Sequence, residues 1–155
     1  MVIVYAVKGF DGANLPLDNP LQVPAHRYSG RVLASGKEAV RTTPKFERGR
    51  LLGDVVFVSG TAAIKGEDSE FSEDTRVQAL GAIDVVEHLV APSNISPDCS
   101  AFRFGYLRVY VRRPQDLEQV REIFISHFKD TPIHFLQADI CRPELLLELE
   151  GVGRA

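Results

Sequence analysis

The sequence predicts one α+β domain, in which two helices cover one face of a mixed β-sheet. Three observations support this fold class. Apolar and β-branched segments of strand length alternate with two stretches of helical periodicity. The chain of 155 residues has the length of a single domain. Its composition, 45% hydrophobic and 25% charged, is that of an ordinary globular protein.

Charge and cysteine content disfavour several classes of partner. A formal net charge of -3 gives no electrostatic footprint for nucleic acid, so we expect no nucleic-acid partner. Cys99 and Cys141 show no pairing pattern, which predicts two reduced thiols. The N-terminal apolar run is too short to cross a membrane and lacks the features of a secretory signal. The sequence therefore predicts a cytoplasmic protein without a membrane partner.

The first 44 residues are predicted to form an irregular segment that packs on a domain made by residues 45–155. Turn-forming glycine, proline and asparagine residues are frequent in this segment. We expect only short strands there, at Val2–Val7 and Gly30–Ala34.

Residues 50–62 are predicted to form a β-hairpin, because apolar and β-branched residues flank a bend at Gly53 and Asp54. A polar loop follows the hairpin and leads into the first predicted helix.

The first helix is predicted to begin at an N-cap, Ser72, with Glu73 and Asp74 in its first turn. It ends before Pro92. The positions that form its apolar face recur at helical spacing: Ala79, Ala82, Ile83, Val86, Leu89 and Val90.

The second predicted helix lies between strands in the second half of the sequence. Residues 102–112 form a long strand, and Pro114 then occupies a first helical position. Residues 133–141 and 145–152 form the last two strands, joined by a turn at Arg142. The apolar face of the second helix is made by Leu117, Val120, Phe124 and Phe128.

Alternation along the strands indicates what each face of the sheet contains. One face should point toward the helices and is purely apolar, with Leu107, Val109, Val111, Leu145, Leu147 and Leu149. The opposite face combines aromatic and charged residues, with Phe104, Tyr106, Arg108, Tyr110, Leu146, Glu148 and Glu150.

Burial of this second face inside a homo-oligomer would explain its aromatic residues. The alternative is a solvated sheet face that carries surface ion pairs. If the face is buried, Arg108 with Glu148 or Glu150 forms either a structural ion pair or part of a ligand site. Glu148 is a candidate general acid, because desolvation in an interface would raise its pKa. Glu150 would act in the same direction and Arg108 in the opposite one.

His134 lies on an apolar strand, where a histidine is either a hydrogen-bonded core residue or a catalytic group. Cys141, at the end of that strand, is interpreted as a small buried hydrophobic residue rather than a nucleophile. No histidine pair has the spacing of metal ligands, and no phosphate-binding or dinucleotide-binding motif is present. We therefore expect neither a metal nor a cofactor.

Several segments resemble the Rid (YjgF) superfamily when they are taken in order. These segments are VFVSGTAAI, YLRVYVRRPQDLEQVREIF and TPIHFLQADICRPELLLELEG. Two stretches are similar to the C-terminal half of the chorismatases, which process chorismate. They are DNPLQVPAHRYS, at residues 18–29, and ADICRPELLLELEG, at residues 138–151.

The resemblance implies a chorismate-mutase-like α+β fold that assembles as a homotrimer around a central barrel. It also implies a small carboxylated metabolite bound in clefts between subunits. Glu148 matches the cleft glutamate, which in chorismatases is thought to protonate the enolpyruvyl side chain of the substrate. His134 stands where Rid imine deaminases have a carboxylate-binding arginine, and we count it with Glu148 as a candidate catalytic residue.

The resemblance also implies a set of ligand contacts. Ser59 matches a strand end that lines the cleft, Phe46 an aromatic lid residue, and Arg121 a position where deaminases have asparagine. Arg27 and Tyr28 either contact a ligand carboxylate or stabilise a turn. The predicted ligand-binding residues are Ser59, Arg108, Arg121, Phe46, Glu150 and Cys141.

The function expected from the resemblance is chorismatase-like hydrolysis or elimination of an enolpyruvyl group. A non-catalytic trimer that binds or senses a metabolite is the first alternative. Imine deamination and an endoribonuclease L-PSP or translation-inhibitor activity are further alternatives. The missing arginine disfavours deamination, and the acidic net charge disfavours an RNA substrate.

Overall fold

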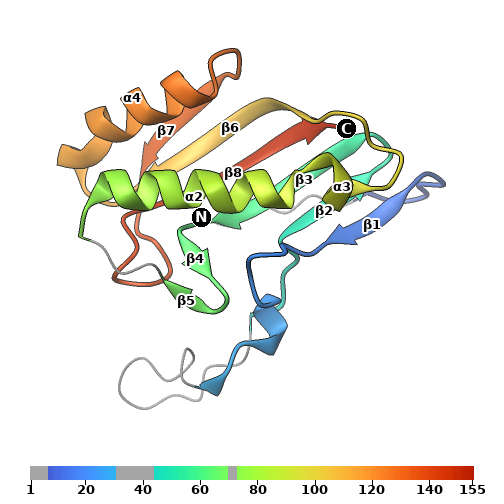
Figure 1. Cartoon of the computed structure of the whole chain (residues 1–155), viewed down its shortest axis with the longest axis horizontal. Helices are drawn as coiled ribbons and strands as arrows, with labels where there is room; N and C mark the ends of the chain where they lie inside the picture. Colours follow the sequence, from blue (N-terminus) through green and yellow to red (C-terminus); the bar gives the residue numbers. More distant parts are fainter. Residues whose placement is uncertain (1–6, 31–43, 70–72) are drawn as a thin grey trace.

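A six-stranded mixed sheet organises the computed structural model, which describes residues 7–30, 44–69 and 73–155. The strand order is β1-β2-β3-β8-β6-β7, and only the pairing of β6 with β7 is parallel. Figure 1 shows this sheet behind two helices. The strands are β1 (Asn14–Leu17), β2 (Gly49–Leu52), β3 (Val55–Thr61), β6 (Arg103–Val111), β7 (Ile133–Gln137) and β8 (Leu147–Arg154).

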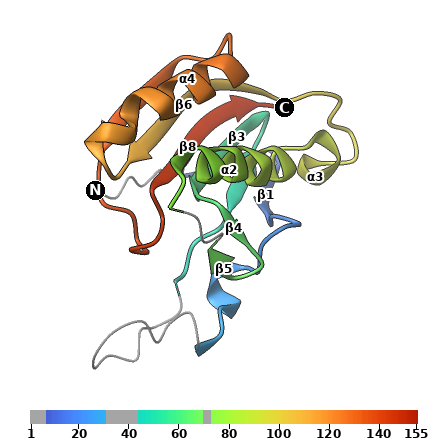
Figure 2. The same cartoon turned by 60° about the vertical axis from the view of Figure 1, so that its left-hand side comes forward.

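The two long helices, α2 (Thr75–Leu89) and α4 (Leu117–His127), lie on the same side of the sheet (Figures 1 and 2). This arrangement confirms the predicted mixed α+β fold with two helices on one face. Short elements complete the described part of the chain: η1 (Ala25–Arg27), α3 (Pro92–Ile95), η2 (Pro114–Asp116), and a separate hairpin of β4 (Ile64–Lys65) and β5 (Asp68–Ser69).

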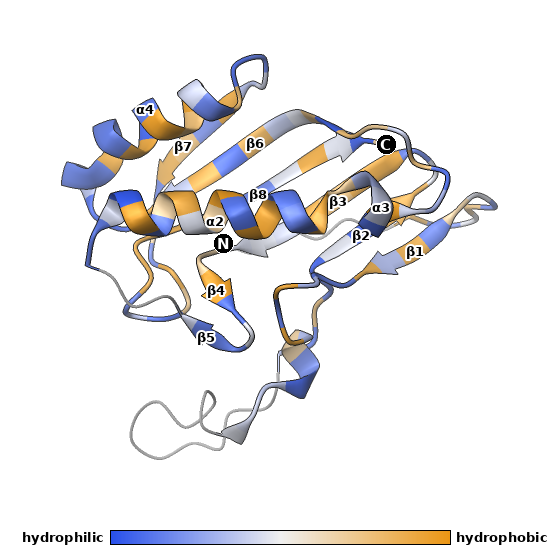
Figure 3. Ribbon diagram, in the orientation of Figure 1, coloured by the Kyte–Doolittle hydropathy of each residue, from blue (hydrophilic) through white to orange (hydrophobic). Residues whose placement is uncertain are grey.

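The hydrophobic core lies between the helices and the sheet, because both contribute an apolar face that water would otherwise contact. Figure 3 shows the polar and apolar residues alternating along β6, as expected for a strand with only one face in the core. The predicted core positions of the sheet and of α2 are confirmed as buried: Leu107, Val109, Val111, Leu147, Leu149, Ala79, Ala82, Ile83, Val86, Leu89 and Val90.

The predicted hairpin is confirmed by the antiparallel pairing of β2 with β3. Gly53 occupies its bend with φ of 65°, a left-handed conformation that residues with a Cβ rarely adopt. The hairpin places Ser59 and Gly60 at the far end of β3, next to β8.

The beginning of α2 differs from the prediction. The expected cap, Ser72, lies outside the described residues, and Asp74 occupies the N-cap position instead. One carboxylate oxygen of Asp74 accepts hydrogen bonds from the backbone N–H groups of Arg76, at 2.8 Å, and Val77, at 3.4 Å. Asp74 therefore precedes the helix rather than belonging to its first turn.

The face occupied by Phe104 was predicted incorrectly. The register of β6 against β8 shifts between Phe104 and Tyr106, so Phe104 pairs with Gly153 while Tyr106 pairs with Val152. This β-bulge turns Phe104 toward the helices, where it packs against the core and meets the ring of Phe128 edge-on at 5.6 Å. Strict alternation from residue 104 onward missed the extra residue.

Two smaller differences concern element ends, and a third concerns the exposure of one side chain. β7 ends at Gln137 rather than at residue 141, and β8 begins at Leu147 rather than at residue 145. Leu117 lies at the beginning of α4 and is 39% exposed. It lies outside the buried apolar face of this helix, which contains Val120 and Phe124.

The N-terminal segment contributes the edge strand β1, which pairs with β2 and contains Pro16. The predicted strands at Val2–Val7 and Gly30–Ala34 lie almost entirely outside the described residues. Among the residues that the structure describes, no helix has the length and hydropathy needed to cross a bilayer.

We expect Asp74→Ala to lower the free energy of unfolding by about 1 kcal/mol, because two backbone N–H groups lose their acceptor. Urea denaturation followed by circular dichroism measures this change. Glu73→Ala is the control, since it removes the same charge one residue earlier without removing the cap. Equal losses in both variants would contradict the role of Asp74.

Candidate functional site

The sheet face opposite the helices brings together four of the residues predicted to form the site. Strand register sets Arg108 beside His134 of β7 on one side and Glu150 of β8 on the other. In the next position along β6, Tyr110 pairs with Glu148. The side chains of this face are half-buried along β6 and β8, whereas His134 on the edge strand is exposed.

Glu150 is occupied by contacts within this face. The Nε of Arg108 lies 2.8 Å from its carboxylate, and the hydroxyl of Tyr110 donates to the same oxygen at 2.6 Å. The Arg108 guanidinium also lies over the ring of Tyr106, 5.6 Å from its centroid. Burial, together with the bond to Glu150, raises the pKa of Tyr110 to about 12. The structural ion pair considered for Arg108 is thus formed, and it involves Glu150 rather than Glu148.

Glu148, by contrast, is packed tightly against the neighbouring strand β3. Its carboxyl group is packed directly over Gly60, where the register of β3 against β8 is irregular. A Cβ atom at residue 60 would collide with the Glu148 carboxyl, so glycine at this position lets the carboxyl lie where it does. Burial raises the pKa of Glu148, and the negative charge of Glu150 acts in the same direction.

The cation that opposes this shift is Arg48, not Arg108 as expected. Arg48 precedes β2 and is only 4% exposed, and its positive charge lowers the pKa of Glu148. Its Nη2 donates to the carbonyl of Val23 at 3.2 Å and to the hydroxyl of Tyr28. Its Nε is buried and has no hydrogen-bond partner among the described residues.

A second arginine shares the ring of Tyr28. The guanidinium carbons of Arg48 and Arg142 lie 5.5 Å and 5.3 Å from the centroid of that ring. Nη1 of Arg142 donates to the carbonyl of Glu67 at 2.8 Å and to the hydroxyl of Ser69 at 3.0 Å. Its Nη2 is buried without a hydrogen-bond partner in the described part of the chain.

Cys141 belongs to the same cluster. Although the residue as a whole is exposed, burial of the thiol raises its pKa. The charge of Glu148 raises it further, and the charge of Arg142 lowers it. Cys141 therefore lies within electrostatic range of both Arg142 and Glu148. Because the residue is exposed, the interpretation of Cys141 as a small buried hydrophobic residue is wrong.

Phe46 and Ser59 lie on either side of Arg48 in the sequence and near it in space. The Phe46 ring, 42% exposed, lies 5.1 Å from the Arg48 guanidinium carbon. Ser59 is half-buried and contacts Arg48 through the backbone. Its N–H donates to the carbonyl of Arg48 at 3.0 Å. Their predicted contacts with a ligand remain predictions.

His134, beside Arg108 on the edge strand, also lines the open edge of the sheet together with Arg121. Both are exposed, and both line a pocket of about 360 Å³ between α4 and β7. The remaining lining residues are mainly apolar: Leu117, Ile125, Ile133 and Phe135. The interpretation of His134 as a core histidine is wrong, and Arg121 is separated from the Glu148 cluster by the layer of the sheet.

Sequence reasoning missed Arg48 and Arg142 as components of the site. Arg48 lies between two other charged residues, Glu47 and Arg50, so its neighbours suggest a surface position. Arg142 precedes a proline and was interpreted only as part of a turn. Tyr28 was considered as a ligand contact or a turn residue, and the structure shows its ring between two guanidinium groups.

No group of histidine, cysteine or acidic side chains among residues 7–30, 44–69 and 73–155 has the arrangement of a metal site. What the Glu148 cluster offers is a carboxyl group with a raised pKa near the buried Arg48, with the half-buried Arg142 across the ring of Tyr28 from Arg48. Such a set can donate a proton and bind an anion.

Comparisons with known proteins show which proteins this chain resembles. No family model matches the chain. A 3-hydroxybenzoate synthase from Streptomyces hygroscopicus is 33% identical over 165 aligned positions, which cover 97% of this chain and 46% of the relative. A chorismatase from Streptomyces rapamycinicus is 29% identical over 97% of this chain and 47% of its own length. The chain thus spans about half the length of the curated relatives it matches.

Solved structures give the same result at the level of the fold. A protein of the Rid family from Yersinia pestis superposes with a TM-score of 0.66 at 13% identity, over 92% of this chain and all of the other. A chorismatase crystal structure superposes with a TM-score of 0.78 at 28% identity, over 93% of this chain and 44% of the other. The protein therefore has the Rid fold. Within that fold it is a homologue of the chorismatases, as the sequence predicted.

The electrostatics of Glu148 lead to a test of its environment. Because the fold raises the pKa of Glu148, its carboxyl contributes stability below its ordinary pKa, and this contribution is lost as pH rises through the raised value.

We expect Arg48→Met to raise the pKa of Glu148 further, because a nearby positive charge is removed. Carbon-13 NMR of labelled glutamate side chains measures the titration.

Arg50→Met is the matched control for this titration. Arg50 is two residues away and forms an exposed ion pair with Glu47 at 2.5 Å. This variant should leave the Glu148 titration where it is. A fall in the pKa of Glu148 in Arg48→Met would show that the arginine is not its electrostatic partner.

Proposed function

We propose that this chain provides a chorismatase-type site, in which Glu148 donates a proton to the enolpyruvyl group of a carboxylated, chorismate-like metabolite. The observation that carries the proposal is the position of Glu148, a carboxyl group with a raised pKa, beside the buried Arg48. The similarity to chorismatases over nearly the whole chain supports the same substrate class.

Protonation is the step for which Glu148 is suited. A carboxyl group of ordinary pKa is almost fully ionised near neutral pH and has little proton to give. Burial against Gly60 and repulsion from Glu150 both favour the protonated form of Glu148. Glu150 cannot share this role as readily, because Arg108 and Tyr110 both hold its carboxylate.

Arg48 and Arg142 are the proposed anion contacts. A buried guanidinium N–H without an acceptor is costly, and a carboxylate oxygen would satisfy it with a charge-assisted bond. Both arginines have such an N–H among the described residues, and both stack on Tyr28, which limits their movement. The proposal therefore assigns the principal anion contacts to this pair rather than to Arg108, Arg121 and His134.

The chemistry follows from the proton transfer. Proton addition to the methylene carbon of the enol ether leaves a positive charge on the adjoining carbon and its ether oxygen. If water adds there, the C–O bond breaks and pyruvate leaves with a dihydroxylated ring acid. If the ring loses a proton and its C–O bond instead, pyruvate leaves and the ring becomes aromatic. Glu148 begins either route.

The proposed assembly is a homotrimer. Tyr106, Arg108 and Tyr110 are half-buried on the uncovered sheet face, and a sheet face of this composition is suited to contact with other copies of the chain. Closing the Glu148 cluster with a neighbouring subunit would exclude water from the arginines and strengthen their attraction for an anion.

A non-catalytic metabolite-binding trimer is the second candidate. The observation that favours it is the exposed His134 at the position where Rid deaminases bind their carboxylate by arginine, since a histidine does not provide a bidentate contact. Under this alternative Arg48 and Arg142 bind the anion, and Glu148 makes a neutral hydrogen bond without proton transfer.

Incubation of the protein with chorismate should release pyruvate, which coupled lactate dehydrogenase measures. Glu148→Gln should lower kcat by on the order of 10²–10⁴-fold, because an amide cannot donate the proton. Arg48→Met should mainly raise KM, and Arg50→Met should change neither constant. If the wild-type chain binds chorismate by calorimetry but releases no pyruvate, the non-catalytic alternative replaces the enzyme proposal.

Sedimentation equilibrium tests the assembly separately. We expect a mass three times that of the chain at micromolar concentration. Tyr106→Glu should shift the mass toward that of the single chain, because a carboxylate would replace an aromatic ring in the interface and would have to lose its water there. Val77→Glu, on the exposed side of α2, is the control and should leave the trimer intact. A single chain mass for the wild-type protein would contradict the proposal.

A further inference from the structure

The connection from β7 to β8, residues 138–146, carries two members of the proposed site and leads directly to the third. Cys141 and Arg142 lie within it, and Glu148 follows two residues after its end. Most of the segment has no regular secondary structure, so its backbone carbonyl and N–H groups need partners from other parts of the chain. Those partners fix where the segment lies.

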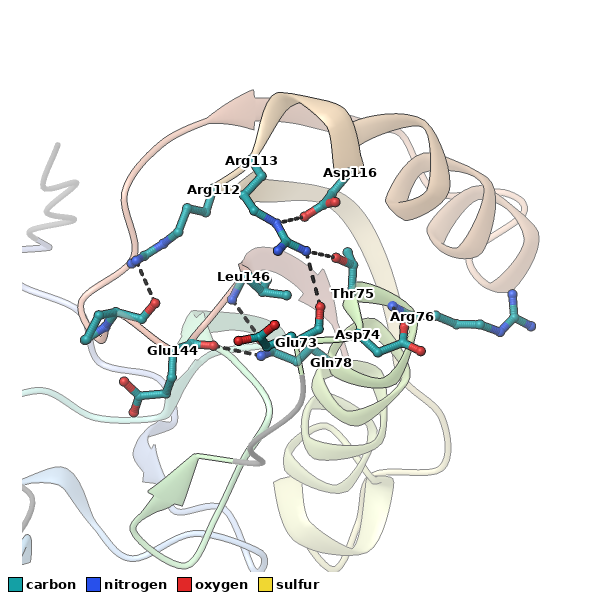
Figure 4. A network of polar contacts seen from close by, with 11 residues as sticks. Glu73, Asp74, Thr75, Arg76, Gln78, Arg112, Arg113, Asp116, Glu144 and Leu146 are labelled. Atoms are coloured by element: carbon teal, nitrogen blue, oxygen red, sulfur yellow. Dashed lines mark hydrogen bonds and ion pairs between the residues drawn. The ribbon is translucent and has the colours of Figure 1, made fainter.

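Arg112, the residue after β6, supplies most of the donors. Figure 4 shows its side chain extended toward the segment. Its Nη2 donates to the carbonyls of Ile140, at 2.6 Å, and Arg142, at 2.9 Å. Its Nη1 donates to the carbonyl of Pro143 at 2.9 Å. The backbone N–H of Arg112 also donates to the carbonyl of Leu146 at 2.8 Å. One side chain thus bonds three of the four carbonyls from residue 140 to residue 143.

Gln78 supplies the remaining contacts from the helix layer (Figure 4). It is completely buried in α2, where a polar side chain is costly unless both ends of its amide are paired. Its Nε2 donates to the carbonyl of Glu144 at 2.8 Å, and its Oε1 accepts from the N–H of Leu146 at 2.8 Å. The amide therefore bonds the chain as a neighbouring strand would, immediately before Glu148.

Arg113 provides a natural comparison. It is adjacent to Arg112 and is also held by several hydrogen bonds, to Asp116 at 2.5 Å, to the Thr75 hydroxyl at 2.9 Å and to the Glu73 carbonyl at 3.3 Å. None of these contacts reaches residues 138–146. Arg113 ties β6 to the start of α2, whereas Arg112 ties β6 to the segment that carries the site.

We propose that Arg112 and Gln78 are positioning residues, which hold residues 140–146 so that Cys141, Arg142 and Glu148 face a common ligand. The consequence for catalysis rests on the proposed function, whereas the position of the segment does not. A misplacement of about 1 Å in a proton donor can cost on the order of 10²-fold in rate. The two side chains thus act on the reaction through Glu148 and Arg142, without touching the substrate.

The thiol of Cys141 reports the position of the segment without any substrate. The chain has two cysteines, so Cys99→Ala leaves Cys141 as the sole thiol. Its rate of alkylation by iodoacetamide is measured between pH 6 and pH 10 in this background. The charged groups that shift the pKa of the thiol are Arg142, which belongs to the segment, and Glu148, which follows it closely. Arg112→Lys and Gln78→Met are compared with Arg113→Lys, and melting temperatures are recorded for all three.

We expect Arg112→Lys and Gln78→Met to raise the alkylation rate at pH 7.5 by on the order of tenfold, because a displaced thiol loses its burial and ionises more readily. Arg113→Lys should lower the melting temperature without changing the thiol. Where chorismate is turned over, the first two variants should lower kcat by on the order of tenfold or more.

An unchanged alkylation profile in Arg112→Lys, with a loss of melting temperature like that of Arg113→Lys, would reduce Arg112 to a stabilising role and overturn the proposal. If Gln78→Met does not fold, the alkylation profile of Arg112→Lys alone tests the positioning role. A changed thiol profile in a protein that never releases pyruvate would retain the positioning role and reject the chorismatase function, so the two failures are distinguishable.

Discussion

The arrangement of this protein depends on one constraint, the accommodation of ionisable groups against a sheet face that is only partly open to water. A carboxyl group and two guanidinium groups cannot be removed from water without partners. Here the partners are distributed unequally. Glu150 has a cation and a phenol, whereas Glu148 has a glycine beneath it and Arg48 nearby. Two acids on the same strand therefore have different neighbours. The contacts of Glu150 make it structural, whereas burial raises the pKa of Glu148 and suits it to chemistry.

The helix layer and the site depend on each other. The apolar face of the sheet binds α2 and α4 through ordinary hydrophobic burial. From within that layer, Gln78 extends a polar amide to the chain just before β8. A core composed only of aliphatic side chains would bury the same area without fixing the backbone at Leu146. The cost of burying Gln78 is offset by two hydrogen bonds, and the result is a defined position for the end of the connection from β7.

Much of the fold could be predicted from the sequence, because its signals are periodic and local. The hairpin, both helices and the alternation of β6 each extend over many residues, so single exceptions do not obscure the pattern. The predictions failed where a single residue determines the local structure. A single extra residue at Gly105 moved Phe104 to the other face, and Asp74 caps α2 although Ser72 is an equally good capping residue.

The candidate site was predicted less completely than the fold, for a related reason. Glu148, Glu150 and Arg108 lie on neighbouring strands, so alternation alone puts them on one face. Arg48 and Arg142 come from irregular segments, and no periodicity indicates that both would stack on Tyr28. Their burial results from tertiary contacts between segments far apart in the chain, which local patterns do not encode.

The two edges of the sheet have different tendencies toward unwanted association. At one edge, β1 contains Pro16, which has no backbone N–H to offer an incoming strand. At the other edge, β7 has no proline, and no strand of the described residues pairs with its outer side. Strand addition, whether by a peptide or in aggregation, is therefore easier at β7. Charged or proline substitutions that improve solubility belong on that strand.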